Sequence, residues 1–321
     1  MKKIILIILF LLISFLSACS EKEKASPINT KDLPPQEDVT FSAGSQTFHI
    51  LPYYEEVLDY IEVAEDNSNL NTLGTWNYTV MDPMKKEMRK QKMIMKLDIP
   101  PTVTNTLKVG KMKEFTAGLL NRQDETNEII KAAVLTSTHL LSPGGDKFIY
   151  ILPVNPQVNM EGMEGVAGWT LDENVILLML NPSYSNERLA YTMAHEYHHA
   201  VTMEHGGGYT NMLDFVLFEG KGDAFARLVY PETETPWTKK ISSEKMEMPF
   251  SQLRENGAYW DGDMYNQWFM GNDSLNIPKW ANYRMGNLIM QEYLNNHKDM
   301  TIEEWTSLDA DEIYIESEYH K

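Results

Sequence analysis

Cysteine is almost absent from this chain of 321 residues, in which Cys19 is the only one. A single thiol cannot form an intramolecular disulfide, and it also excludes the cysteine clusters that hold many structural zinc ions. Any metal site in this chain must therefore be built from histidine, aspartate and glutamate side chains.

Basic residues are scarce as well. The chain has 28 lysines and arginines against 46 aspartates and glutamates, which gives a formal charge of −18. The phosphates of a nucleic acid would repel so acidic a protein, and we therefore expect no nucleic-acid partner. Anionic lipid head groups would repel it too, although the same acidity can simply keep an exported protein soluble.

Long apolar runs are missing except at residues 4–16, "IILIILFLLISFL". This run is short for a membrane span, but two lysines before it and small residues after it are typical of a secretion signal. The junction "LSAC" resembles a bacterial lipoprotein cleavage site, which implies that residues 1–18 are removed and that Cys19 carries lipid such as palmitate. The alternative is an uncleaved N-terminal anchor.

The next segment, residues 19–40, is rich in lysine, glutamate, serine and proline and poor in large apolar residues. Such a composition predicts a flexible tether. We expect one folded domain over residues 41–321, with a helical first part at about 50–140 and a catalytic core at about 145–300. The protein would then lie outside the cytoplasm, attached to the bacterial cell membrane through lipid on Cys19.

Hydrophobic periodicity predicts an α+β fold that is mostly helical, with a small sheet beside a histidine-rich helix. Short β-branched and apolar runs predict strands at 147–154 and 174–182. The expected helices are residues 53–66, 82–97, 111–141, 183–205, 211–231 and 278–297.

The helix at 183–205 contains the motif H-E-x-x-H, formed by His195, Glu196 and His199. Two histidines four residues apart project from one face of a helix and can bind one Zn²⁺. Zinc makes a bound water more acidic, and the adjacent carboxylate of Glu196 can accept its proton during attack on a carbonyl. The motif has three fixed positions, so the alternative is a helix that carries its histidines by chance.

The third zinc ligand has two candidates. His205 has the spacing of the last histidine in the metzincin pattern H-E-x-x-H-x-x-G-x-x-H. That pattern requires glycine where this chain has Thr202, and a β-branched residue resists the sharp turn that would bring the third histidine back to the metal.

The other candidate is Glu219, which lies with Asp223 in an E-x-x-x-D pattern on the next expected helix. This pair resembles the gluzincin arrangement, which implies that Glu219 is the third ligand and that Asp223 accepts a hydrogen bond from the far nitrogen of a zinc histidine. Two histidines and one carboxylate would leave a fourth position for water. Otherwise both residues are solvent-facing charges of an acidic protein.

These motifs together resemble a bacterial family of predicted zinc-dependent proteases, catalogued as a domain of unknown function. The resemblance rests on the segments "AHEYHHAV" and "FEGKGDAFA". The segments "GVAGWT", "NVILLMLNP" and "WANYRMGNLIMQEYL" fit the general layout of the family. The resemblance implies a gluzincin-like metallopeptidase with one Zn²⁺ per chain on His195, His199 and Glu219, with Glu196 as base and a protein or peptide as substrate. The lysine and glycines of "EGKGD" depart from the more apolar helix start expected there.

Further site residues are expected around this centre. The segment "VAGWT", with Gly168 and Trp169, is a candidate edge strand that would pair with the substrate backbone. Tyr283 or Arg284 would donate a hydrogen bond to the oxyanion. The competing function is a lipoprotein that binds zinc or another ligand without catalysis, but metal binding alone does not require Glu196.

Overall fold

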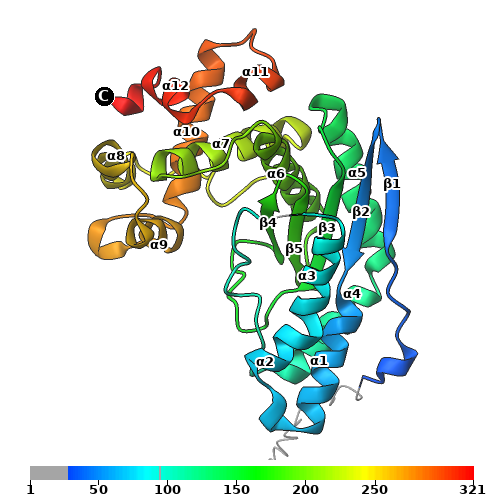
Figure 1. Cartoon of the computed structure of the whole chain (residues 1–321). Coiled ribbons are helices and arrows are strands. Elements are labelled where there is room, and N and C mark those ends of the chain that lie inside the picture. Colours follow the sequence, from blue (N-terminus) through cyan, green and yellow to red (C-terminus); the bar gives the residue numbers. More distant parts are fainter. Residues whose placement is uncertain (1–27, 94) are drawn as a thin grey trace, which may run out of the picture.

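The computed structural model describes residues 28–93 and 95–321, and a mixed five-stranded sheet organises the first half of this chain (Figure 1). Its strands are β1 (Val39–Ala43), β2 (Gln46–Pro52), β3 (Lys147–Pro153), β4 (Val166–Asp172) and β5 (Val175–Leu180). The strand order is β1-β2-β3-β5-β4, with β2, β3 and β5 parallel and the two edge strands antiparallel to their neighbours. The segment "VAGWT" therefore lies on an edge strand, as predicted.

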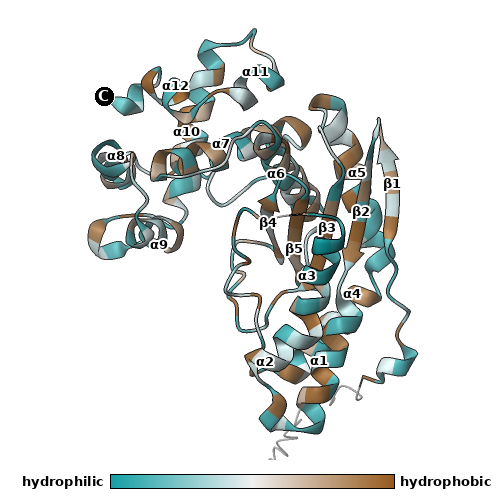
Figure 2. Ribbon diagram, in the orientation of Figure 1, coloured by the Kyte–Doolittle hydropathy of each residue, from teal (hydrophilic) through white to brown (hydrophobic). Residues whose placement is uncertain are grey.

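The central strands β3 and β5 are apolar on both faces, which explains their continuous hydrophobic runs. Ile149 and Ile151 belong to one buried cluster, whereas Tyr150 and Leu152 belong to the cluster on the opposite face. Figure 2 shows these strands as the most hydrophobic part of the ribbon. The sheet therefore needs helices on both sides.

Helices supply both covers. Apolar residues of α1 and α3 pack on one face of the sheet, and those of α5 and α6 pack on the other. The helices of this half are α1 (Tyr54–Asp66), α2 (Leu73–Trp76), α3 (Asp82–Lys90), α4 (Val109–Leu120), α5 (Gln123–Leu140) and α6 (Asn186–Glu204).

The second half of the described chain is helical and extends from one edge of the sheet (Figure 1). Its helices are α7 (Met212–Val229), α8 (Glu244–Asn256), α9 (Gly262–Met270), α10 (Ala281–Asn296), α11 (Ile302–Ser307) and α12 (Ala310–Ile315). The architecture is thus α+β, as the sequence pattern predicts. In the described part of the chain, no helix is both long and apolar enough to cross a membrane.

The helices α7 and α10 cross with their backbones in contact. A Cβ atom on Gly220 would lie 2.5 Å from the carbonyl oxygen of Gly286, and a Cβ on Gly286 would lie 2.3 Å from that of Val216. No side chain fits in such a gap, so this crossing requires glycine on both helices. The approach brings α10 close to the residues that α7 presents.

Several predicted boundaries differ from the structure. The helix expected over 82–97 ends at Lys90, and the helix expected over 111–141 is two helices, α4 and α5. The hairpin β1–β2 is not among the predicted elements. Its segment "VTFSAGSQTFHIL" alternates between more and less buried residues, and Gly44 in the turn has a φ of +62°. The first part of the domain is therefore not purely helical, because β2 pairs in parallel with β3 and extends the sheet.

The expected signal peptide (1–18), the lipid site at Cys19 and the first part of the expected tether (19–27) lie outside the described residues. The described residues of the expected tether, 28–40, contact the folded domain. The side-chain oxygen of Gln36 accepts hydrogen bonds from the N–H groups of Tyr54 and Glu55, at 2.6 and 3.0 Å, and so caps α1. Strand β1 starts at Val39, two residues before the predicted start of the domain.

The crossing of α7 and α10 generates the first prediction. Gly220→Ala or Gly286→Ala should lower the free energy of unfolding by about 1–3 kcal/mol, because the new methyl group must push two backbones apart. Thermal or denaturant unfolding measures the change. Gly110→Ala in α4 is the matched control, since nothing lies within 4 Å of a Cβ there. Equal stability of all three variants would contradict this account of the crossing.

Candidate metal centre

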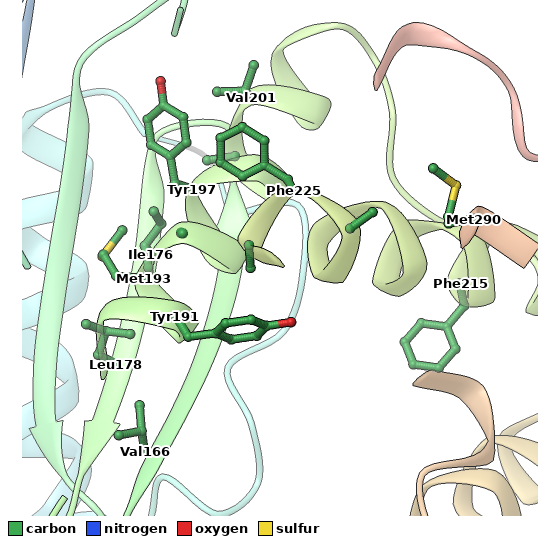
Figure 3. Close-up of a cluster of buried hydrophobic side chains, with 14 of the residues drawn as sticks. Val166, Ile176, Leu178, Tyr191, Met193, Tyr197, Val201, Phe215, Phe225 and Met290 are labelled. Atoms are coloured by element: carbon green, nitrogen blue, oxygen red, sulfur yellow. The ribbon is translucent and has the colours of Figure 1, made fainter. Parts of the chain in front are cut away.

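Helix α6 carries the H-E-x-x-H motif between the sheet and α7. The hydroxyl of Ser185 accepts a hydrogen bond from the N–H of Arg188 at 3.2 Å and caps the helix. The apolar face of α6 is buried, and Figure 3 shows Met193 and Tyr197 beside β5; this face consists of Leu189, Met193, Tyr197, Ala200 and Val201. With that face fixed on the sheet, the histidine face points toward α7.

The two histidines and Glu219 converge on one point. Glu219 Oε2 lies 3.2 Å from His195 Nε2 and 3.7 Å from His199 Nε2. The imidazole rings are edge to face, with their centroids 4.4 Å apart. One potential ligand atom from each of the three residues lies within 4.8 Å of the others, and all three side chains are buried. This is the only group of this kind found among the described residues.

The local sequence "EGKGD" is explained by this convergence. A Cβ on Gly222 would lie 2.7 Å from Cε1 of His199 and 2.9 Å from Cε1 of His195. Gly220 is required at the crossing with α10. The ammonium of Lys221 points to the reverse side of α7, where it donates to the carbonyl oxygens of Thr306 and Leu308. The two glycines weaken the helix locally, but they let α7 lie directly against both imidazoles.

The charges of the three groups are strongly coupled. Burial raises the pKa of Glu219, but its hydrogen bonds to both histidines outweigh burial and leave that pKa at about 2. Burial and the nearby His195 lower the pKa of His199 to about 4. Burial also lowers the pKa of His195, but Glu219 and the nearby carboxylates reverse that effect and raise it. The site thus holds an ionised carboxylate against a neutral His199 ring, which suits a cation.

Glu196 lies where α6 meets the edge strand β4. Thr170 donates its hydroxyl to Glu196 Oε2 at 2.8 Å and to the Glu196 backbone carbonyl at 2.9 Å. Gly168 runs so close that a Cβ would be 2.5 Å from Glu196 Cγ. Burial, with a contribution from Glu219, raises the pKa of Glu196 to about 7. This carboxylate can therefore bind and release a proton near neutral pH.

Asp223 is brought near the site, but its hydrogen bonds differ from the expected ones. Its Oδ1 accepts from the hydroxyl of Tyr191 and, at 2.8 Å, from the indole N–H of Trp237. Its Oδ2 is buried without a partner, as is Nδ1 of His199. Within the described residues, no hydrogen bond joins Asp223 to either histidine of the motif.

The two oxyanion candidates are separated, although they are adjacent in sequence. The ring of Tyr283 lies 6.3 Å from that of His195, and burial together with the charge of Glu219 raises the pKa of its hydroxyl well above the ordinary value. Arg284 points away and donates to the backbone carbonyls of Pro236, Trp237, Lys239 and Lys279. Only Tyr283 is in a position to meet a substrate at this centre.

The remaining histidines of the cluster lie elsewhere. His205 is the exposed C-cap residue of α6 and does not join the buried group. His198 faces the opposite side from the metal group, where its Nε2 lies 3.1 Å from the hydroxyl of Thr306 and its ring stacks on Trp305. Burial lowers the pKa of His198 far below its ordinary value, so this ring is neutral.

The matching protein family confirms the general reading of the sequence. A family described as "Predicted Zn-dependent protease (DUF2268)" matches residues 126–315, which is more than half of the chain. The chain belongs to this family. The match to these predicted zinc-dependent proteases begins in α5, includes α6, α7 and α10, and ends with α12. No curated protein and no solved structure matches the chain.

Sequence reasoning missed several residues of this family member's site. Thr170 lies within the quoted "VAGWT", but its bond to Glu196 joins residues 26 positions apart. Tyr209 and Tyr265 line the same cavity as Glu196 and Glu219. Trp237, which donates a hydrogen bond to Asp223, lies 14 residues after it and belongs to none of the motifs. The only available signal was the aromatic content of these segments.

Zinc content tests the geometry of this centre. Glu219→Ala should remove the carboxylate between the two imidazoles and take the zinc content from one per chain toward zero. His205→Ala should leave it unchanged, because that ring is exposed at the helix end. Elemental analysis of metal-replete protein measures both, with Glu187→Ala on the exposed side of α6 as control. The reverse result, with zinc lost only in His205→Ala, would show a metzincin-like site.

Proposed function

We propose that this protein is a membrane-tethered, extracytoplasmic zinc metallopeptidase with one Zn²⁺ held by His195, His199 and Glu219. The observation that carries the proposal is the convergence of these three side chains beside a fourth, Glu196, whose pKa burial raises to about 7. The family description, a predicted zinc-dependent protease, supports the same reaction class.

The residues present fit zinc. Two imidazole nitrogens and one carboxylate oxygen form the donor set of many catalytic zinc sites, and three protein ligands leave a position for a substrate group. The low pKa of Glu219 and the low pKa of His199 mean that both donors are already deprotonated at neutral pH, as metal binding requires. When bound, zinc supplies Lewis acidity, which polarises a carbonyl and makes water a stronger acid.

Glu196 is the proposed general base. It would accept a proton from the attacking water and pass that proton to the nitrogen of the leaving amine. Thr170 holds one carboxylate oxygen at 2.8 Å, which fixes the direction from which the other oxygen reaches the substrate. The close passage of Gly168 covers one side of this carboxylate and contributes to the burial that raises its pKa.

The edge strand β4 is the proposed partner of the substrate backbone. One side of β4 pairs with β5, and at its C-terminal end the carbonyl oxygen of Leu171 accepts from the N–H groups of Lys96 and Leu97 at 3.0 and 2.9 Å. The part that would pair with an extended peptide is therefore residues 166–170, next to Glu196. Tyr283 is the proposed hydrogen-bond donor to the oxyanion, since its hydroxyl stays protonated.

The competing function, a lipoprotein that binds zinc or another ligand without catalysis, would need the metal group alone. It gives no reason for a buried carboxylate beside that group, held by Thr170 with a pKa near neutrality. A carboxylate buried without an opposite charge to balance it destabilises a fold, so its presence favours catalysis over storage or capture.

Glu196→Gln separates the two functions. The amide cannot accept a proton, so kcat/KM for peptide hydrolysis should fall by roughly 10²- to 10⁴-fold while zinc content is unchanged. A quenched fluorescent peptide library and elemental analysis measure the two quantities, with Glu187→Gln on the same helix as control. Equal hydrolysis by Glu196→Gln and the wild type would exclude Glu196 as the base.

Attachment to the membrane is proposed from the sequence of the first residues. Mass spectrometry of the N-terminal peptide of the mature protein should find Cys19 as the first residue with lipid attached. Cys19→Ser should move the protein from the membrane fraction to the soluble exported fraction. A mature chain that begins before Cys19 would point instead to an uncleaved anchor.

A further inference from the structure

The cavity at the metal group is walled mainly by aromatic side chains. Besides Tyr283, it is lined by Trp169, Tyr209, Phe215, Phe218, Tyr265 and Phe269. Leu97 and Met163 complete the apolar wall, and its charged groups are the two carboxylates Glu196 and Glu219. The aromatic part of this wall favours apolar groups, because a charged side chain placed against it would lose its water without gaining a partner there.

One side of the wall is continuous with the metal group itself. Phe218 lies flat on His199, with ring centroids 3.8 Å apart and an interplanar angle of 7°. Tyr209 meets Phe218 edge-on at 5.4 Å and Phe215 at 5.2 Å. A side chain next to the bond being cleaved would therefore meet aromatic carbon as soon as it leaves the metal group.

Helix α9 continues this wall. Tyr265 and Phe269 lie one turn apart, with nearly parallel rings whose centroids are 6.1 Å apart, and both line the cavity. Tyr265 also packs against Phe215 and Trp260, with ring centroids 5.2 and 5.7 Å away, but Phe269 does not anchor the helix. Met264 and Trp268 do so from its other face, where both are buried and the Trp268 indole donates to Gln252 at 2.7 Å.

The half-buried state of Phe269 is therefore not explained by the packing of α9. The cavity in this structure is only about 60 Å³, the space of about two waters. A large substrate side chain enters only when the aromatic rings that line the cavity move apart. Each ring then regains apolar contact with that side chain. A small or polar side chain would not offset the separation of these rings.

We propose that this cavity selects peptides with a large apolar or aromatic side chain at one of the two residues flanking the cleaved bond, and that Phe269 and Tyr265 of α9 are specificity-determining residues. This inference rests on the proposed peptidase function. It adds the substrate class, which neither the metal group nor the family description contains.

The first test uses the zinc-loaded wild-type mature chain and a peptide library randomised on both sides of the cleaved bond. We expect phenylalanine, tyrosine or leucine at one flanking position, with kcat/KM at least about tenfold above that for aspartate or lysine. Cleavage without this preference would overturn the inference and leave the peptidase function intact. Absence of cleavage in the wild type, under conditions where it binds zinc, would overturn both.

The second test redesigns the wall. Phe269→Arg introduces a cation facing the cavity, so kcat/KM for the phenylalanine peptide should fall at least about tenfold and the ratio of glutamate to phenylalanine peptide should rise. Met270→Arg is the matched control, because it adds the same charge one residue later on a side chain that is 64% exposed. The control should keep the wild-type preference.

Phe269→Ala and Phe269→Leu provide an independent pair with little risk to folding. The leucine variant should keep the preference for apolar peptides, and the alanine variant should weaken it, with zinc content equal to wild type in both. The inference is wrong if Phe269→Arg and Phe269→Ala bind zinc, cleave peptides and retain the wild-type preference.

Discussion

The absence of a side chain at Gly222 is the constraint on which the metal centre depends. Because no Cβ stands between them, α7 lies against the rings of His195 and His199, and Glu219 on the preceding turn can reach between their nitrogens. Asp223 follows on the same helix and is fixed by Tyr191 and Trp237. The separation between α6 and α7, more than any single hydrogen bond, determines whether three ligand atoms meet.

The edge of the sheet completes the centre by fixing Glu196. Thr170 and Gly168 enclose this carboxylate from the side of β4, while Glu219 is surrounded by histidines on the side of α7. Burial raises the pKa of both carboxylates of this cavity, but the net result differs because the two histidines lower the pKa of Glu219 again. Burial leaves Glu196 with a pKa of about 7, and it is overcome at Glu219, whose pKa is about 2. Two chemically identical groups thereby differ in protonation: Glu219 is ionised at neutral pH, whereas Glu196 titrates near it.

Periodic features of this protein were predictable from sequence, and contacts between distant segments were not. The cap at Ser185, the apolar stripe of α6 and the strands β3 and β5 follow from local patterns, and the spacing after the motif indicated Glu219. The glycines of "EGKGD" counted against a helix because local propensity does not include the rings packed against them. The bond from Thr170 to Glu196 has no local signature.

The sequence also does not show which of two neighbouring residues faces the cavity. Nothing in the sequence separates Tyr283 from Arg284, yet successive helical positions differ by about 100° in direction, so one faces the cavity and the other pins a loop. The hairpin β1–β2 is a different case. Its alternating pattern is present in the sequence, but no strand is predicted before residue 147.

The reverse side of the metal helices is closed by a segment from much later in the chain. His198 contacts Thr306, 108 residues downstream, and Lys221 donates to the carbonyl of Leu308, 87 residues downstream. Contacts so distant in sequence form late, because the closure of a long loop must precede them. As the chain emerges from its N-terminus, α6 and α7 acquire their final support only after nearly the whole polypeptide has been released. Under the proposed function, the peptidase would become competent last, when its own loops are already folded and no longer exposed to cleavage.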